Sequence, residues 1–178
     1  MASRRQQRKE KIPAILSVVP ALDYRLEIEF GSGSFLDLNM RHCMLTNRYY
    51  KLNTPAVFRA VFTDGDTIIF VPNDPFTPDI FPREAVNMAL RRWYHDPIAF
   101  LRAEPIENSR IRLEMATGST LVLNMENHWL ASRYSALQDE KLFGSVRADG
   151  ETLVFGDLQI NGDELTHLML SIPDLEAN

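Results

Sequence analysis

Cysteine is almost missing from this chain, since Cys43 is the only one among its 178 residues. A single thiol excludes an internal disulfide framework and fits a reducing compartment. No apolar run reaches the length that spans a bilayer, and the basic N-terminal stretch has no apolar core of the kind that a signal peptide needs. We therefore expect a cytoplasmic protein that has no membrane partner.

Sequence motifs typical of metal-binding, phosphate-binding or catalytic sites are also missing. None of the four histidines belongs to a set of two close Cys/His pairs, the spacing that binds zinc. The turn Gly31-Ser32-Gly33 is too short for a phosphate-binding loop and lies between two predicted strands. A lone cysteine such as Cys43 is more often a small apolar residue than a nucleophile. The sequence thus predicts no metal, no cofactor and no catalytic residue, and we expect a protein that is not an enzyme.

Charge is distributed unevenly along the chain. The formal net charge is −5, but residues 1–11 hold five basic residues against Glu10, so the remainder carries −9. An acidic body argues against a broad nucleic-acid surface, because duplex binding depends on neutralised phosphates. The N-terminal segment is predicted to be a disordered, solvated tail. It also provides candidate residues for weak contact with nucleic acid or an acidic partner, namely Arg4, Arg5, Arg8 and Lys9.

What the chain does contain is a block that occurs twice, 85 residues apart. An ungapped alignment of residues 14–70 with 99–155 gives 21 identical pairs out of 57, whereas typical composition gives about three by chance. The identical pairs include Leu36/Leu121, Leu38/Leu123, Asn39/Asn124, Met40/Met125, Leu45/Leu130, Arg48/Arg133 and Tyr49/Tyr134. This pattern indicates an internal duplication, with units at 12–95 and 96–173 and a short tail at 174–178.

Within each unit, the residue pattern predicts strands and helices in one order. Leu26, Ile28 and Phe30 alternate with charged residues, as in a half-buried strand. Asp64-Gly65 is a strong hairpin signal and recurs as Asp149-Gly150. We therefore predict an α+β fold of two tandem units related by an approximate two-fold axis. Each unit contains a three-stranded antiparallel meander, a helical segment, a two-stranded hairpin and a final helix.

The same pattern predicts which side chains form the core. Apolar residues on the strands and one phenylalanine of the helical segment should be buried in each unit. They are Leu26, Ile28, Leu36, Leu38, Phe58, Ile111, Leu113, Leu121, Leu123 and Phe143. Polar features that occur in both units, Asn39-Met40 and Arg48-Tyr49, are interpreted as structural, because what the fold requires should recur.

Several short motifs of the first unit follow one another in a recognisable order. They are Pro20, Asp23-Tyr24-Arg25-Leu26, Gly33, Asp37-Leu38, Phe58 with Val61, Asp64-Gly65, and Val71-Pro72 through Pro82. This order resembles the bacterial domain-of-unknown-function family 2442, and the second unit departs from it at Asn108-Ser109, Val122 and Gly156-Asp157. The resemblance implies a small α+β domain, sometimes attached to a helix-turn-helix domain or encoded beside a toxin-like partner. It implies no catalytic residue.

The proline-rich segment Pro72–Pro82 is specific to the first unit. Its apolar residues Phe76, Ile80 and Phe81 stand among four prolines, and a stiff loop with apolar side chains suits protein recognition because little entropy remains to be lost. These three residues are candidates for partner binding, and a lid over the first core is the alternative. We predict a non-enzymatic protein-binding module, an antitoxin-like neutraliser or an adaptor subunit of a bacterial complex. The alternatives are a nucleic-acid-associated regulator that uses the basic tail, or an enzyme with a site between the repeats.

Overall fold

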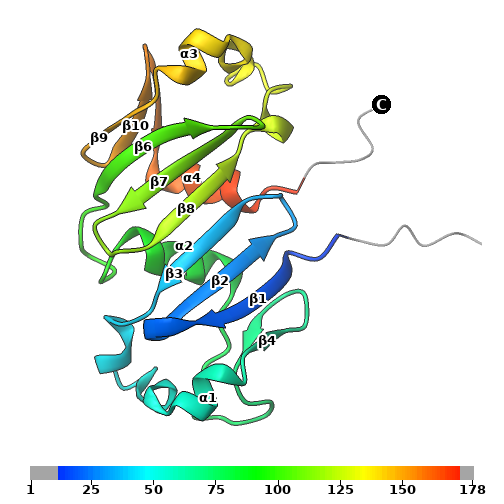
Figure 1. The fold of residues 1–178 in the computed structure, drawn as a ribbon, viewed down its shortest axis with the longest axis vertical. Helices are drawn as coiled ribbons and strands as arrows, with labels where there is room; N and C mark the ends of the chain where they lie inside the picture. Colours follow the sequence, from blue (N-terminus) through cyan, green and yellow to red (C-terminus); the bar gives the residue numbers. More distant parts are fainter. Residues whose placement is uncertain (1–11, 173–178) are drawn as a thin grey trace, which may run out of the picture.

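A computed structural model describes residues 12–172 of the chain, and its centre is a six-stranded antiparallel sheet (Figure 1). The strand order is β1-β2-β3-β8-β7-β6, so each half of the sequence supplies three consecutive neighbours. These strands are β1 (Ile15–Ala21), β2 (Arg25–Phe30), β3 (Phe35–Asn39), β6 (Phe100–Ile106), β7 (Arg110–Met115) and β8 (Thr120–Asn124). Together with four α-helices in the described residues, the sheet confirms the predicted α+β class.

The smaller elements follow the sheet strands in each half. After β3 come 3-10 turns, a short helix, a hairpin and a longer helix, and the same order follows β8. The helices are α1 (Pro55–Arg59), α2 (Pro82–Leu90), α3 (Glu140–Gly144) and α4 (Gly162–Leu170). The hairpin strands are β4 (Phe62–Thr63), β5 (Ile68–Ile69), β9 (Arg147–Asp149), β10 (Thr152–Phe155) and β11 (Leu158–Asn161).

One face of the large sheet carries the core. Leu26, Ile28 and Phe30 of β2 are fully buried, while Glu27 and Glu29 between them are exposed, as alternation in a strand requires. Helices α2 and α4 lie behind the sheet in Figure 1, where α2 packs on β3, α4 packs on β8, and the two helices contact each other. Nine of the ten predicted core residues are buried, and Phe143 is partly buried.

Strands β3 and β8 join the two halves in the middle of the sheet. Leu36 pairs with Leu121, its own counterpart in the sequence repeat. The flanking pairs are Phe35 with Val122 and Asp37 with Thr120. Because Leu36 and Leu121 are both fully buried, this antiparallel joint merges the apolar faces of the two meanders into one core.

Side-chain hydrogen bonds across this joint occur in reciprocal pairs. Asn39 Nδ2 donates to the Thr117 carbonyl at 3.1 Å, and Asn124 Nδ2 donates to the Ser32 carbonyl at 3.4 Å. The backbone amides of the same two asparagines donate to hydroxyls of the opposite half, as Asn39 N to Ser119 Oγ and Asn124 N to Ser34 Oγ. The repeated Asn39 and Asn124 therefore bind each half to the turn of the other half.

Two further hydroxyls attach each turn to the last helix of the opposite half. Thr117 Oγ1 donates to the Ala89 carbonyl of α2 at 2.6 Å, and Ser32 Oγ donates to the Met169 carbonyl of α4. Both hydroxyl-bearing residues are buried. These bonds satisfy carbonyls near the C-terminal ends of the helices, which have no partner within the helix itself.

The hairpins close the two edges of the sheet. Phe100 N of β6 donates to the Gly150 carbonyl of the β9–β10 turn at 3.1 Å, and Ile15 N of β1 donates to the Gly65 carbonyl at 2.9 Å. Gly65 adopts φ +98°, a conformation that side-chain-bearing residues rarely take. The edge strands also contain Pro20 and Pro105, which cannot donate to another strand.

The second half differs from the prediction by one strand. The prediction has a two-stranded hairpin directly before the final helix, but residues Leu158–Asn161 form a further strand, β11, which pairs with β10. Gly156 turns the chain back at φ +58°, and no proline follows before α4, so the returning segment can pair. In the first half the corresponding contact is one bridge between Ile68 and Ile80, because Pro72, Pro75 and Pro78 prevent a continuous ladder.

Candidate protein-binding groove

A groove of about 700 Å³ runs along the outer side of α2. Pro82 begins this helix at its first position, where proline is favoured because its missing N–H has no partner there in any case. The buried residues of α2, which are Ala85, Val86, Ala89 and Leu90, face the core. The other side chains of α2 except Pro82 line the groove, together with residues just before and after the helix and one residue of α4. The lining is Phe81, Arg83, Glu84, Asn87, Met88, Arg91, Arg92, Trp93, Tyr94 and Asp163.

Aromatic side chains stand at both ends of the helix and are exposed. Phe81 before α2 is 59% exposed, and Trp93 and Tyr94 after it are 51% and 83% exposed. The turn that presents the second pair is held by Trp93 N, which donates to Asp96 Oδ2 at 3.2 Å. Exposed aromatics around one concave surface are typical of protein-binding sites, where Trp and Tyr contribute strongly to affinity.

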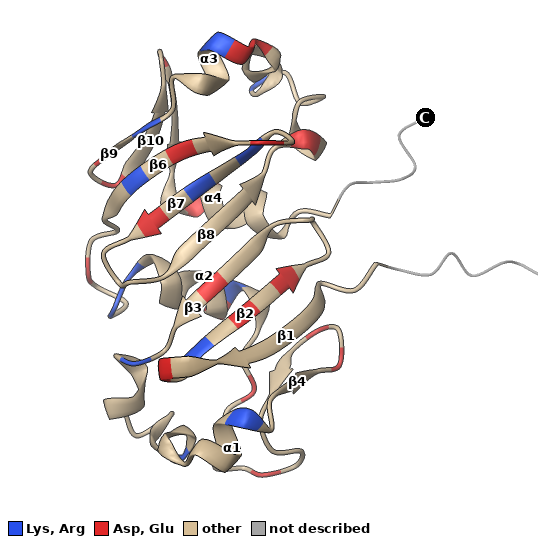
Figure 2. Ribbon diagram, in the orientation of Figure 1, with Lys and Arg blue, Asp and Glu red and all other residues tan. Residues whose placement is uncertain are grey.

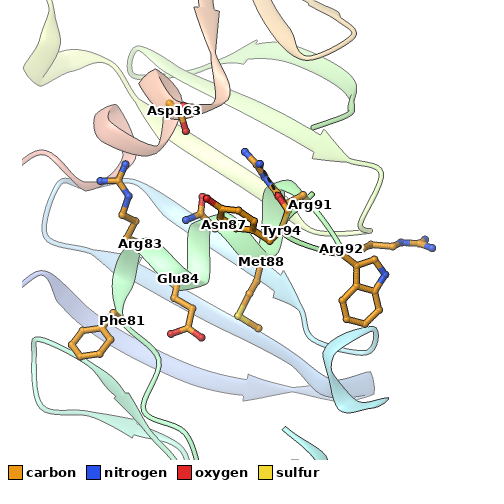
Figure 3. A pocket seen from close by; sticks show the side chains of 10 residues that line it. Phe81, Arg83, Glu84, Asn87, Met88, Arg91, Arg92, Tyr94 and Asp163 are labelled. Carbon is orange, nitrogen blue, oxygen red and sulfur yellow. Dashed lines mark hydrogen bonds between the residues drawn. The ribbon is translucent and has the colours of Figure 1, made fainter. Parts of the chain in front are cut away.

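The charge of the groove is mainly positive. Arg83 and Arg92 are exposed and have no ion pair within residues 12–172, whereas Arg91 Nη1 donates to the Tyr94 carbonyl at 3.2 Å. Figure 3 shows Arg83 and Arg91 on one side of α2, and Glu84 and Met88 on the other. Asp163 of α4 also lies on the side of Arg83 and Arg91, so this side has one more cation than anions and is suited to a negatively charged ligand.

The carboxylate of Glu84 already has partners in the protein. Arg48 Nη2 lies 3.0 Å from it, and the Tyr49 hydroxyl donates to it. Partial burial, followed by the hydrogen bond to Glu84, raises the pKa of Tyr49 well above its usual range, so the phenol stays protonated and donates. Because Arg48 already neutralises the charge of Glu84, Glu84 offsets less of the positive charge of the arginines that line the groove.

The same arrangement exists in the second half. Arg133 donates to Glu164 of α4 at 2.9 Å, and the Tyr134 hydroxyl donates to the same carboxylate. Partial burial and the hydrogen bond to Glu164 raise the pKa of Tyr134 to about 12. In each half, the repeated Arg-Tyr pair therefore attaches the first turn of the final helix to the segment that follows the third strand of the meander. The sequence alignment missed these glutamates because they lie beyond residue 70, where the two halves differ in length.

The predicted partner-binding residues take different positions. Phe81 lines the groove, and Phe76 is 66% exposed but does not line it, since its ring lies under Lys51 Nζ at 4.3 Å. The prediction that Ile80 binds a partner is wrong. Ile80 is fully buried and forms a β-bridge with Ile68, so it belongs to the core. The basic candidates Arg4, Arg5, Arg8 and Lys9 lie outside the described residues.

Sequence reasoning missed the cationic and aromatic residues around α2. The available signal was that Arg91-Arg92-Trp93-Tyr94 has no counterpart after α4, where Ser171 and Ile172 follow instead. A charged aromatic segment present in only one of two repeats is a candidate for function.

Burial shifts the pKa values of Cys43 and His42. Cys43 is buried, and burial raises the pKa of its thiol to about 12, which leaves it protonated and unreactive at neutral pH. Burial, followed by the nearby Arg92, lowers the pKa of His42. Among residues 12–172, no group of three His, Cys, Asp or Glu side chains is arranged to hold a metal ion. Within the same range, no helix has the length and apolarity needed to cross a bilayer.

Comparison of the chain with protein-family models, with curated proteins and with solved structures gives no significant match in any of the three. The resemblance to the domain-of-unknown-function family 2442 therefore stays a prediction, and the function is inferred from the groove.

Proposed function

We propose that this chain is a non-enzymatic protein-binding module, a neutraliser or adaptor that holds an acidic segment of a partner protein in the groove along α2. The observation that carries the proposal is the combination of exposed Phe81, Trp93 and Tyr94 with the guanidinium groups of Arg83 and Arg92, which form no ion pair within residues 12–172. Arginine binds carboxylates through charge-assisted and often bidentate hydrogen bonds, and aromatic rings supply contact area at low entropic cost.

The proposal includes the origin of the molecule: two tandem units related by an approximate two-fold axis, produced by duplication. The support is the self-pairing of Leu36 with Leu121 and the reciprocal bonds of Asn39 and Asn124. In such a molecule the features required for folding recur in both halves. The groove residues after α2 do not recur, which favours a role in binding.

Trp93 provides a direct test, because it lines the groove. In a Trp129→Phe background, Trp93 is the remaining tryptophan of the two in the chain. We expect its fluorescence to change on titration with a short peptide of alternating Glu and Phe, and not with the matched Lys and Phe peptide. A response to short oligothymidine and not to the acidic peptide would assign the groove to single-stranded nucleic acid, which also uses arginines and aromatic stacking.

Matched variants connect the response to the proposed side chains. Arg83→Ala with Arg92→Ala removes two exposed cations that have no hydrogen-bond partner to lose among the described residues. We expect the affinity for the acidic peptide to fall at least about tenfold, as loss of two charge-assisted contacts implies. The control is Arg59→Ala with Arg147→Ala, which removes the same charge outside the groove. Equal affinities in both variants would refute the proposal.

A further inference from the structure

The large sheet has a second face that nothing in residues 12–172 covers. Helices α2 and α4 pack on one face, and the opposite face is turned towards the viewer in Figures 1 and 2. The strand registers place two rows of side chains across all six strands of this open face. One row is Ser17, Glu29, Phe35, Val122, Arg112 and Glu104, and the other is Val19, Glu27, Asp37, Thr120, Glu114 and Arg102.

The two halves of the open face have opposite charge. On β1, β2 and β3, one arginine, Arg25, stands among the carboxylates Glu27, Glu29 and Asp37, which gives a net charge of −2. On β8, β7 and β6, three arginines stand against two carboxylates, which gives a net charge of +1. The three are Arg102, Arg110 and Arg112. In Figure 2, acidic residues predominate on β2 and β3, whereas basic and acidic residues are mixed on β6 and β7.

Part of this charge has no partner within the described residues. Arg25 binds Asp37 through two bonds of 2.8 Å, and Arg102 binds Glu104 at 2.7 Å. The exposed Glu27, Glu29 and Arg112 form no ion pair among residues 12–172. In the second half, Arg110, Arg112 and Glu114 also form no ion pair among residues 12–172 and leave a net charge of +1, so the two halves of the face attract each other.

We infer that the open face binds a second copy of this chain, with the two sheets stacked and the acidic half of each copy lying over the basic half of the other. A two-fold axis parallel to the strands, between the two sheets, produces this arrangement, and the partly buried Phe35 and Val122 of each copy then lie near the centre. A two-fold axis perpendicular to the strands would place acidic halves over each other, which like charges oppose.

Pairing with a second copy through the edge strands of the large sheet is hindered by the structure. The hairpin turns bond to the edge strands at Ile15 and Phe100, and each edge strand contains a proline, Pro20 or Pro105. Edge-to-edge extension of the sheet is therefore blocked, and the open face is the extended surface that remains for two sheets to pack at about 10 Å.

The size of the face indicates a weak dimer. Six strands at about 4.8 Å spacing and about 3.3 Å per residue give a footprint of roughly 500 Å² per copy. The total of roughly 1,000 Å² is at the lower limit for specific interfaces. We therefore expect association at micromolar to near-millimolar concentration, and we expect added salt to weaken it, because the exposed charges are screened.

Sedimentation equilibrium of the full chain tests the inference through a charge exchange. An acidic-face variant, Arg102→Glu with Arg112→Glu, makes both halves negative, and a basic-face variant, Glu27→Arg with Glu29→Arg, makes both halves positive. We expect each variant alone to associate at least tenfold more weakly than the wild type, whose monomer mass is 20.4 kDa. An equimolar mixture of the two should recover association, since oppositely charged halves then face each other.

The control is Arg59→Glu with Lys141→Glu, which makes the same change of charge as the acidic-face variant on exposed positions outside the sheet. We expect it to associate as the wild type does. Recovery in the mixture also shows that neither variant is misfolded. A wild-type chain that stays monomeric at all concentrations, the result expected if residues 1–11 covered the acidic half, overturns the inference. So does a mixture that associates no better than its components.

Discussion

The first half of the chain uses nine residues, 71–79, to pass from Phe70 to the buried Ile80, whereas the second half uses four, 156–159, to pass from Phe155 to the buried Ile160. Both routes deliver an isoleucine to the core and then a nine-residue helix. The extra residues are therefore not needed to build the unit. The second half therefore shows that a shorter connection builds an equivalent unit, and the groove of the first half is lined by Phe81 and later residues, not by the longer loop.

The largest difference in stability between the two halves should appear when their equivalent phenylalanines are replaced by alanine. Phe58 is 3% exposed and packs on Phe70, while Phe143 is only partly buried. Phe58→Ala should cost about 3–5 kcal/mol of unfolding free energy, as full removal of a buried ring does. Phe143→Ala should cost about 2 kcal/mol, because less of its ring leaves an apolar environment. Urea unfolding of both variants measures the difference, and equal costs would refute the comparison.

A smaller effect should distinguish the two asparagines at the central joint. Asn124 is 7% exposed, and its side chain donates to the Ser32 carbonyl and accepts from Glu126 N. Asn124→Ala should cost about 1–3 kcal/mol, because it leaves buried partners without hydrogen bonds. Asn39→Ala should cost about 1 kcal/mol, since Asn39 is less buried and water can replace it. If Asn39→Ala were the more destabilising change in thermal unfolding, the joint would not be organised as described.

The hydrogen bonds of Arg133 and Tyr134 to Glu164 predict that the stability of the fold depends on pH. Partial burial raises the pKa of Glu164, but hydrogen bonds from Arg133 and Tyr134 outweigh this and lower it below its ordinary 4.5. A carboxyl group with a lowered pKa stabilises the fold above pH 4.5, and this contribution is lost as pH falls through the folded-state value. Glu164→Gln should therefore be about 1 kcal/mol less stable than the wild type at neutral pH. The difference should disappear in acid. A constant difference across the pH range would contradict this explanation.

The smallest effect on stability should come from shortening the first half. Replacing residues 71–79 by Gly-Asp-Leu-Gln, the sequence of residues 156–159, should change the unfolding free energy by less than about 1 kcal/mol, because Phe76 is exposed and Ile80 is retained. Binding of the acidic peptide should also persist, since Phe81 and the arginines remain. A large loss of thermal stability would instead identify the proline-rich loop as a lid over the core.

Much of the architecture was predictable from the repeat and from strand alternation. The pattern around Leu26 and Ile28 predicts the buried face because alternation is a local property of each strand. Strand β11 was missed because Leu158–Asn161 is short and its pairing depends on the turn at Gly156. The burial of Ile80 was missed for a related reason: a bridge to Ile68 is a tertiary contact, and the neighbouring prolines concealed it. The groove required the structure, because Phe81 and Trp93 lie at opposite ends of α2 and line one surface only in the folded chain.

The central claim is that the first half carries the binding groove while its counterpart in the second half does not. Backbone amide chemical shifts of the labelled chain, titrated with the peptide of alternating Glu and Phe, test this claim most directly. We predict that the largest changes map to Phe81, Arg83, Asn87 and Arg91–Tyr94, with residues of α4 beyond Asp163 unaffected. Changes that are equal along α2 and α4, or confined to the second half, would contradict the account.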